Sequence, residues 1–420
     1  MIKYILTILF FLVNCIPSGV SAQWVKINSL SASVVQDIKY DNGIIYAVSS
    51  GGLWKSENLG INWTNISNGL TAEALHTYQI LLDSSSIYIA TEEGNFRSTN
   101  GGQTWEPKSN GIAIGPGALR RFCYSLIRYN NAMYCGAFAG LYKSTDGGDN
   151  WTFSGITGPH SNVHVLYPYE GDLWAGRTNT ASNGTLQRTT DDGATWTPIQ
   201  FFGQFNPEVF CFHTAPDNKL FIGTGHGVYS STNNGANWTT LNTGLPSDPY
   251  ISSIVQRGNT IFASGKFGAG GIFRTFNEGA TWDEVTDNLP FISDMYHLEI
   301  IQDTLYLGAS NGIYKRALSE ILTGISPVSS GVPDKFNLHQ NYPNPFNPST
   351  TIKFDIPKSR FVTLKVYDAT GRQVAILVNE NLSPGSYSAE FRADGLTSGI
   401  YFYKLITGEY SITRKMVLVK

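Results

Sequence analysis

The sequence predicts an all-β protein, namely a seven-bladed β-propeller followed by a small C-terminal immunoglobulin-like β-sandwich. Three observations predict this fold class. Glycine accounts for 43 of 420 residues and aromatic residues for 13%, whereas charged residues reach only 15%, which is typical of many strands and tight turns. A motif ending in tryptophan recurs six times between hydrophobic hairpins. Residues 333–420 read as short alternating strands separated by turns.

The composition excludes two broad classes of protein. A net charge of -3, from 29 basic and 32 acidic residues, leaves no excess of lysine and arginine to displace phosphate counterions, so a basic nucleic-acid binder is excluded. A hydrophobic content of 41% can bury a large core, so a disordered chain is excluded as well.

Residues 1–22 are typical of a secretory signal peptide. Lys3 precedes the apolar run 4–13, which is too short to span a bilayer, and Ala22 ends a stretch of small residues suited to cleavage. A lipoprotein signal that uses Cys15 is the alternative. No later apolar run approaches the roughly 18 residues of a helical span, so none is expected in the mature chain.

Three cysteines remain after Cys15, namely Cys123, Cys135 and Cys211, and an odd number cannot form a closed disulfide framework. A turn at 130–131 would place Cys135 opposite Leu126. Leu126 and Cys123 are three residues apart in one strand and therefore on opposite faces, so a bond between Cys123 and Cys135 is not expected. We expect three buried thiols in strands.

The recurring motif reads Ser/Thr, any residue, Asp/Asn, any residue, Gly, any residue, Thr/Asn, Trp. The hydroxyl and the Asp/Asn oxygen can bond to backbone NH groups of a tight turn, and the glycine permits a positive φ. The tryptophan covers the turn with a large apolar ring. Each motif is therefore expected to build the turn of a β-hairpin. The third and eighth positions are Asn58 and Trp63, Asn100 and Trp105, Asp146 and Trp151, Asp191 and Trp196, Asn233 and Trp238, and Asn277 and Trp282.

A second marker counts the repeat independently, because a hydrophobic hairpin lies upstream of each motif position. Two hairpins per repeat give four strands, which is the size of a propeller blade. The predicted turns of these hairpins are Asn42-Gly43, Ser84-Ser85, Asn130-Asn131, Gly171-Asp172, Asp217-Asn218, Gly258-Asn259 and Gln302-Asp303.

Seven hairpins against six motifs predict a ring closed by the N-terminus. The seventh unit, 304–316, stops after its third strand, whereas residues 23–26 form an isolated strand that carries Trp24 nearly one repeat before Trp63. We infer that this strand completes the seventh blade and joins the first and last blades by backbone hydrogen bonds. Residues 23–318 then form the propeller.

These repeats resemble bacterial neuraminidase (Asp-box) repeats, and residues 23–318 resemble the propeller superfamily of sialidases, sortilin ectodomains, xyloglucanases and photosystem assembly factors. The resemblance implies that the motif lies between the third and fourth strands, away from the ligand face. No catalytic or metal-binding role is therefore expected of Asp146 or Asp191.

Residues 319–332 are rich in serine and glycine and predict a linker. A segment with three prolines, 341–350, follows, and it cannot lie in the centre of a sheet because proline lacks an NH. The remainder predicts a small β-sandwich. Its predicted strands are 351–356, 362–367, 373–378, 385–391, 400–406 and 415–419.

The segment NYPNPFNPST, the turn 367–371, the stretch 382–387 and the terminal KMVLVK closely resemble the type A sorting domain of the type IX secretion system of Bacteroidetes-like bacteria. The resemblance implies Sec export, recognition by the outer-membrane translocon and removal of residues 333–420 by its sorting peptidase. The expected location is extracellular or the outer cell surface. A carbohydrate-binding or spacer sandwich is the alternative.

Any site of such a propeller is expected on the loops between blades and between second and third strands. Further polar candidates on these loops are Glu73, His76, Glu92, Glu93, Glu208, Lys266 and Asp294, and no catalytic residue is assigned. The binding candidates are Arg120, Arg121, His160, Arg177, Phe202, Phe205, His226, Tyr250 and Phe267.

No enzyme signature stands out. Sialidases usually carry an Arg-Ile-Pro segment, which does not occur, and Arg97, Arg188 and Arg274 recur beside the motif as structural residues would. No metal-ligand spacing or phosphate loop is found, so no metal or cofactor is expected. We expect a non-catalytic secreted or cell-surface propeller that binds protein or glycan. A glycan-active hydrolase or lyase with an unrecognised site is the alternative.

Overall fold

The computed structural model describes residues 23–31, 34–114, 120–138, 140–156, 162–177, 185–201, 207–266, 270–321, 325–329, 332–382, 384–393, 396–408 and 410–420. The predicted signal peptide, 1–22, lies outside these residues. Within them, no helix is long and apolar enough to cross a membrane. The chain divides into a unit spanning Trp24–Leu322 and a second unit containing Thr323–Lys420, and each has its own hydrophobic core.

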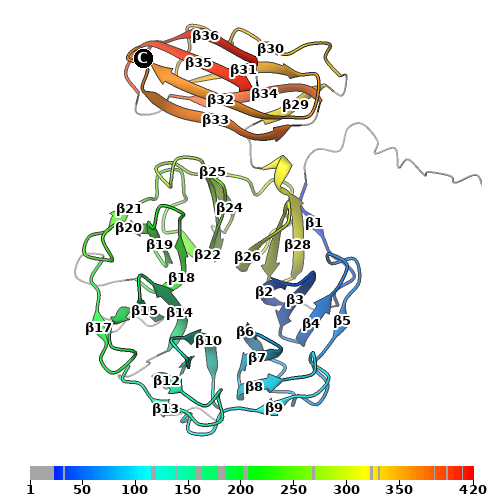
Figure 1. Cartoon of the computed structure of the whole chain (residues 1–420), viewed down its shortest axis with the longest axis vertical. Helices are drawn as coiled ribbons and strands as arrows, with labels where there is room; N and C mark the ends of the chain where they lie inside the picture. Colours follow the sequence, from blue (N-terminus) through cyan, green and yellow to red (C-terminus); the bar gives the residue numbers. More distant parts are fainter. Residues whose placement is uncertain are drawn as a thin grey trace, which may run out of the picture. The chain divides into compact units, whose positions relative to one another are not determined.

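In the described part of the first unit, seven four-stranded antiparallel sheets form the ring seen in Figure 1. This arrangement confirms the seven-bladed propeller. From the inner strand outward, the blades are β2 (Val35–Asp41), β3 (Ile44–Ser49), β4 (Gly52–Ser56), β5 (Thr64–Asn65); β6 (Thr77–Asp83), β7 (Ser86–Thr91), β8 (Gly94–Ser98), β9 (Glu106–Pro107); β10 (Cys123–Tyr129), β11 (Ala132–Ala137), β12 (Gly140–Ser144), β13 (Thr152–Phe153); β14 (Val163–Tyr169), β15 (Asp172–Arg177), β16 (Leu186–Thr189), β17 (Thr197–Pro198); β18 (Val209–Thr214), β19 (Leu220–Thr224), β20 (Gly227–Ser231), β21 (Thr239–Thr240); β22 (Tyr250–Arg257), β23 (Thr260–Lys266), β24 (Ile272–Thr275), β25 (Asp283–Glu284); and β26 (Met295–Ile301), β27 (Thr304–Ala309), β28 (Gly312–Ala317), β1 (Val25–Lys26).

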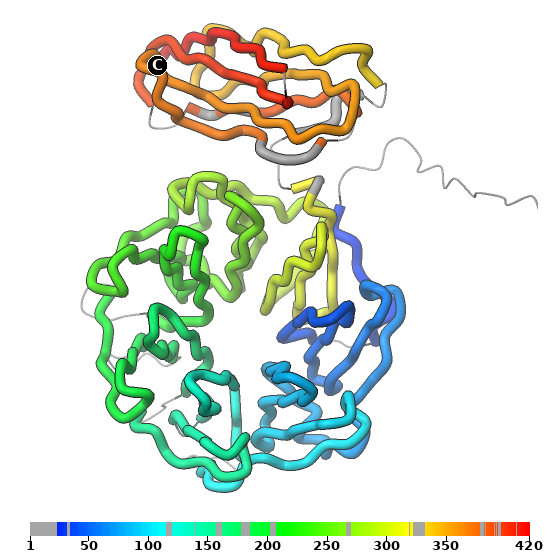
Figure 2. The backbone as a smooth tube through the Cα atoms, in the orientation of Figure 1, coloured from blue at the N-terminus to red at the C-terminus, as the bar shows by residue number. Residues whose placement is uncertain are grey.

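The N-terminal strand β1 closes the ring, as the repeat count predicts. Val25 lies opposite Lys315 of β28, and the backbone NH of Ile27 donates to the carbonyl of Ile313 at 2.9 Å. Figure 2 shows this contact as the blue N-terminal trace running beside the yellow last blade. The first and last blades are therefore joined by backbone pairing within one sheet.

Trp24 takes the place of the motif tryptophan that the seventh blade lacks. Its Nε1 donates to the carbonyl of Val285 at 3.1 Å, whereas Nε1 of the motif residue Trp282 donates to the carbonyl of Leu241 at 2.8 Å. Both acceptors directly follow the outer strand of the preceding blade. Apolar contacts add to this closure, because Trp24 is only 6% exposed and belongs to a hydrophobic core shared by blades 6 and 7.

The second unit is a β-sandwich, as predicted. Its core includes Phe354, Leu364 and Tyr403 from both sheets. The two four-stranded sheets of its described residues are β29 (Ile325–Ser329), β34 (Gly385–Arg392), β31 (Ser349–Ile356), β30 (Asn337–Leu338), and β33 (Gln373–Leu382), β32 (Arg360–Asp368), β35 (Gly399–Thr407), β36 (Tyr410–Leu418).

Strand β29 lies inside the segment 319–332 that the sequence predicts as a linker. Ile325 pairs with Ala389 of β34, and β29 forms the edge of its sheet. An edge strand tolerates Pro327, because its missing NH costs no ladder hydrogen bond on the open side. The Ser- and Pro-rich composition that favours a linker is therefore compatible with an edge strand.

The proline-rich segment lies along the end of β36. The NH of Phe346 donates to the carbonyl of Val417 at 3.0 Å, and the NH of Val419 donates back to Phe346 at 3.0 Å. The buried Tyr403 hydroxyl accepts from the NH of Asn341 and donates to the carbonyl of His339, both at 2.9 Å. These few bonds hold a segment whose prolines cannot join a ladder.

Candidate ligand-binding face of the propeller

The six Asp-box motifs share one turn geometry across the described residues. In each, the first hydroxyl accepts from the glycine NH at 2.8–3.0 Å. The Asp or Asn Oδ1 accepts from the NH of the seventh residue, also at 2.8–3.0 Å. The glycine φ lies between 75° and 92°, a conformation in which any other residue would be strained.

The two aspartates of this set are held in their ionised form by the turn. The pKa of Asp146 is lowered to about 2 chiefly by the backbone NH of Asn150, and the pKa of Asp191 is lowered to about 2 chiefly by the Thr195 hydroxyl. The second oxygen of Asp146 accepts from the Asn150 amide at 2.8 Å. Carboxylates occupied in this way serve the turn rather than a ligand.

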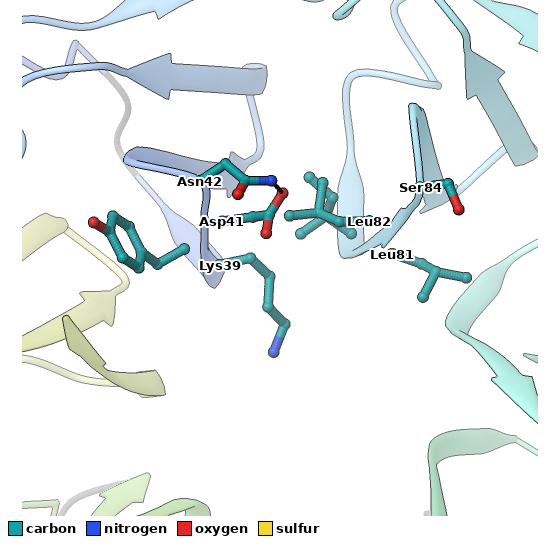
Figure 3. Close-up of a pocket in the computed structure, with 8 residues that line it drawn as sticks. Lys39, Asp41, Asn42, Leu81, Leu82 and Ser84 are labelled. Atoms are coloured by element: carbon teal, nitrogen blue, oxygen red, sulfur yellow. Dashed lines mark hydrogen bonds between the residues drawn. The ribbon is translucent and has the colours of Figure 1, made fainter.

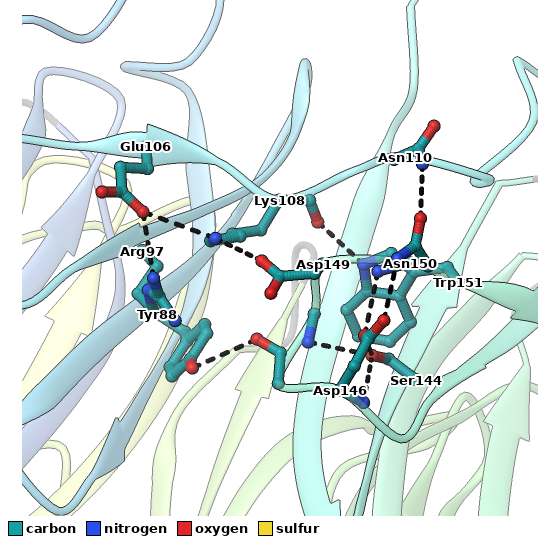
Figure 4. A network of polar contacts seen from close by, with 12 residues as sticks. Tyr88, Arg97, Glu106, Lys108, Asn110, Ser144, Asp146, Asp149, Asn150 and Trp151 are labelled. Atoms are coloured by element: carbon teal, nitrogen blue, oxygen red, sulfur yellow. Dashed lines mark hydrogen bonds and ion pairs between the residues drawn. The ribbon is translucent and has the colours of Figure 1, made fainter.

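The motif also joins each blade to the preceding one, as Figure 4 shows for blades 2 and 3. Nε1 of Trp151 donates to the carbonyl of Lys108 at 2.8 Å, and the Tyr88 hydroxyl donates to the carbonyl of Gly147 at 3.2 Å. The ammonium of Lys108 pairs with Asp149. The motif face therefore binds neighbouring blades together.

At the opposite end of the blades, every inner strand contains a β-bulge at the same place. The register shifts by one residue in all seven inner pairings of the described propeller, near the start of the inner strand. A bulge leaves one residue out of the ladder and re-aims its side chain. The residues skipped in this way are Gln36, Tyr78, Tyr124, His164, Phe210, Ser252 and Tyr296.

The backbone around these bulges is packed too closely for a side chain on the neighbouring strand. Gly136 lies opposite Ser125 in blade 3, and a Cβ on it would lie 2.4 Å from the carbonyl oxygen of Val163. Val163 directly precedes the bulged His164. Glycine at this position therefore permits the close approach of the next blade.

Aromatic residues from blades 2, 3 and 4 form an arc, which we define as Tyr78, Phe122, Tyr124 and His164. Tyr78 meets Tyr124 edge-on with ring centroids 5.1 Å apart, and Tyr124 stacks on His164 at 4.1 Å. The ring of Phe122 lies 6.4 Å from Tyr124, nearly parallel to it. Burial raises the pKa of Tyr124 to about 12 and raises the pKa of Tyr78 above its usual value, so both hydroxyls stay protonated at neutral pH.

A polar rim, which we define as Glu73, His76, Glu92 and Arg120, borders this arc. Nη1 of Arg120 lies 2.7 Å from Oε2 of Glu92, and its Nη2 lies 3.5 Å from Glu73. The Tyr78 hydroxyl donates to Oε1 of Glu92 at 3.2 Å, and Nδ1 of His76 lies 3.4 Å from the same oxygen. The carboxylate of Glu92, in the loop between β7 and β8, thus contacts Arg120, Tyr78 and His76.

The sequence-derived binding candidates fall into two described groups and one outlier. Arg120 belongs to the polar rim, and Nε of its exposed neighbour Arg121 donates to the Ile112 carbonyl at 3.0 Å. Tyr250 lies 5.9 Å from the ring of Phe210 at blades 5 and 6.

In the same part of the propeller, Nδ1 of His226 lies 2.7 Å from Oδ1 of Asp248. Arg177 is buried instead, and this burial lowers its pKa. The candidates outside the described residues are His160, Phe202, Phe205 and Phe267.

None of the seven bulged residues is among the sequence-derived candidates, because those were sought in loops rather than at the starts of strands. Tyr78, Tyr124, His164 and Phe210 occupy equivalent positions in four consecutive blades. An aromatic ring recurring at one repeat position, just after a buried residue, was the available signal.

The bulge also corrects the expected position of the cysteines. Cys123 and Cys135 lie in one hydrophobic cluster with Leu126, because the bulge at Tyr124 changes the alternation of faces along β10. The expectation that they face opposite sides is therefore wrong. Cys123 and Cys135 are free thiols and buried, whereas Cys211 is only partly buried. Burial, and secondly a hydrogen bond with Cys135, raise the pKa of Cys123.

A cavity of about 450 Å³ opens between β2 and β6 toward the other end of the inner strands (Figure 3). Lys39, Asp41 and Leu81 are among its lining residues. The Lys39 ammonium lies 3.8 Å from the Asp37 carboxylate, which also lies 3.4 Å from His297. Among the residues that the structure describes, no group of three or more His, Cys, Asp or Glu side chains could hold a metal ion.

The fold and the motif geometry define an Asp-box β-propeller joined to a β-sandwich. The sequence model of the BNR/Asp-box repeat family matches residues 96–107, and that of the secretion system C-terminal sorting domain family matches residues 340–420. The chain therefore carries an Asp-box repeat and a type IX secretion sorting domain, and the sorting domain indicates secretion to the cell surface or outside.

Solved structures similar to this chain are propeller proteins of low sequence identity. PorZ, a surface component of the type IX secretion system of Porphyromonas gingivalis, is 16% identical over 91% of this chain with a TM-score of 0.51, and the chain spans 59% of its length. YCF48, solved with the D1 peptide, is 17% identical over 75% of this chain and 98% of its own, with a TM-score of 0.54.

A third similar structure is the extracellular domain of BT4673 from B. thetaiotaomicron. It is 13% identical, with 96% of this chain and 59% of the other covered and a TM-score of 0.57. No curated protein matches the sequence. At these identities the structures support the fold alone.

Proposed function

We propose that this chain is a non-catalytic binding module that holds a protein or glycan ligand on the bulged face of its propeller. The observation that carries the proposal is the bulge repeated in every inner strand of the described propeller. Bulges of this kind re-aim side chains at the rims of barrels and beside binding sites. Five of the seven re-aimed residues carry aromatic rings, which supply contact area at low entropic cost.

The proposal includes the route to the cell surface. Residues 1–22 serve as a Sec signal peptide, residues 23–318 form the mature propeller, and residues 333–420 are recognised by the type IX translocon and removed by its sorting peptidase. The match of the sorting-domain model to residues 340–420 supports this assignment.

The contacts of the charged groups favour binding over catalysis. Both carboxylates of the polar rim, Glu73 and Glu92, are engaged by Arg120. Arg188 and Arg274 do not converge on a substrate site, because each donates to a backbone carbonyl 46 or 47 residues further along the chain. A glycosidase needs one carboxyl group free to move a proton.

Two experiments test the proposal. Export is tested in a bacterium with a type IX system, where the full chain is expected at the surface or in the medium and a chain ending at residue 332 is expected to stay in the cell. Binding is tested by presenting the purified chain to arrayed glycans and arrayed secreted proteins, with Phe210→Ala and Tyr124→Ala as variants.

A signal lost in these ring variants and kept in the motif variant Asp191→Asn supports the proposal. Absence of any ligand on both arrays contradicts it. Hydrolysis of sialosides, xyloglucan or pectin by the purified chain contradicts its non-catalytic part.

A further inference from the structure

We propose that the arc and the polar rim together form a subsite for a neutral sugar of an oligo- or polysaccharide. This inference rests on the proposed function and assigns its ligand class. Three observations carry it, namely the pairing of the charged groups at the site, the geometry of the Arg120–Glu92 pair and the scattered positions of the exposed apolar residues.

The charged groups at the site are paired with one another or bonded to neighbouring polar groups. Arg120 pairs with both Glu73 and Glu92, and the carboxylate of the adjacent Glu93 accepts from the Thr71 hydroxyl. The guanidinium of Arg121 is directed to a backbone carbonyl. An anionic ligand would compete with Glu73 and Glu92 for Arg120, and a cationic ligand would compete with Arg120 for those carboxylates. A neutral ligand meets neither cost.

The paired groups offer donors and acceptors side by side. Arg120 is 42% exposed, so part of its planar donor fork faces solvent, and Glu92 keeps lone pairs beside it although its side chain is only 17% exposed. Two adjacent hydroxyl groups of a sugar can donate to such a carboxylate and accept from such a guanidinium at once. Hydrogen bonds to charged groups are stronger than those between neutral ones.

The arc supplies the apolar half of the subsite. Phe122 and Tyr78 contact Tyr124 on two of its sides and are half-buried, so neither side chain is fully covered. A sugar places its C–H groups and its hydroxyls on different sides, and a site with aromatic rings beside a few fixed polar groups suits that division.

The described surface argues against a protein occupant of this subsite. The large exposed apolar residues of the described propeller lie singly on different elements, and such scattered residues do not form the contiguous patch of a protein interface. They are Val25, Ile61, Ile114, Phe153 and Phe291.

The test uses residues 23–420, the chain without its signal peptide, in affinity electrophoresis and calorimetry. The ligands are mannan, xyloglucan and mixed-linkage glucan, with polygalacturonate as an anionic probe. Glu92→Gln removes the carboxylate with little change of shape. Asp83→Asn is its matched control, because Asp83 pairs with Arg128 between the same two blades at the other end of the same inner strands.

We expect at least one neutral polysaccharide to bind, and Glu92→Gln and Arg120→Leu each to weaken binding about tenfold or more. Asp83→Asn should change the Kd less than about twofold, and raising the salt from about 0.05 M to about 0.5 M should have equally little effect. Thermal unfolding of each variant establishes that it is folded.

Three results would overturn the inference: no binding of any neutral polysaccharide, salt-sensitive binding of polygalacturonate alone, or equal losses in Glu92→Gln and Asp83→Asn. A protein-array signal that Phe210→Ala abolishes, without any glycan binding, would refute this inference and leave the proposed function standing. Absence of ligands in both assays would refute both.

Discussion

Replacing Trp24 by alanine tests the closure of the propeller most directly. Trp24 is 6% exposed and belongs to the core shared by blades 6 and 7. Truncating a buried tryptophan to alanine costs about 3–5 kcal/mol, from lost burial and the cavity left behind. The indole also donates to the Val285 carbonyl, but Nη1 of Arg316 lies 3.0 Å from the same oxygen, so no unpaired carbonyl adds to this cost.

This cost predicts a measurable shift of the melting temperature. The propeller unit has about 300 residues, and an unfolding entropy of about 2.1 cal/mol/K per residue gives about 0.6 kcal/mol per degree. Trp24→Ala should therefore lower the melting temperature of the propeller by about 5–8 °C, measured by scanning calorimetry on the chain that begins at residue 23.

Val25→Ala is the matched control on the same strand. Val25 is 55% exposed, so its truncation should shift the melting temperature by less than about 1 °C. If Trp24→Ala and Val25→Ala have the same melting temperature, the N-terminal strand does not stabilise the ring, and the closure argument fails.

Three further changes probe other parts of the chain. Gly136→Ala should cost about 1–3 kcal/mol in denaturant unfolding, because its Cβ would collide with the backbone of the next blade; a neutral effect would show that this backbone can move. Asp146→Asn should lower the melting temperature more than Asp191→Asn. The Asp146 side chain accepts from the Asn150 amide, which can only donate from its nitrogen, whereas the Thr195 hydroxyl opposite Asp191 can change from donor to acceptor. A larger decrease for Asp191→Asn would contradict this turn geometry. Since both folded pKa values lie near 2, below the unfolded value, the stability that these carboxylates contribute is present above about pH 4 and lost as the pH falls toward 2, and both variants should flatten that part of the stability profile. Tyr403→Phe should cost about 1–3 kcal/mol and speed hydrogen exchange at the Asn341 amide, which loses its acceptor; unchanged exchange would show that another group binds it.

The fold could be predicted because its determinants are local and repeated. Each Asp-box contains all the residues that its turn requires, and the third residue, such as Asn58 or Asp146, accepts the same backbone hydrogen bond in each motif. The closure followed from counting, since the last unit lacks one strand and Trp24 begins the chain with one. The predicted sandwich strands overlap those of the structure because turns such as 368–371 mark their ends, but β36 begins at Tyr410 rather than at the predicted residue 415.

The candidate site was predicted less well, because it depends on register. Placing Tyr124 in the bulge requires knowing how β10 pairs with β11, and the same one-residue shift reversed the expected faces of Cys123. Contacts such as that of Arg120 with Glu92 join loops of different blades and leave no local pattern. Strand β29 was missed because pairing at a sheet edge places few demands on composition.

The contact between Trp24 and Val285 spans 261 residues of sequence. A ribosome makes the first of these residues long before the last, so the circle cannot be sealed until nearly the whole propeller has been synthesised. Pairings this distant form slowly, because the intervening chain must be ordered first. The order of the strands thus delays closure of the propeller. A newly made chain that is to be exported therefore stays unfolded for longer, which is the state in which it can pass through a membrane channel.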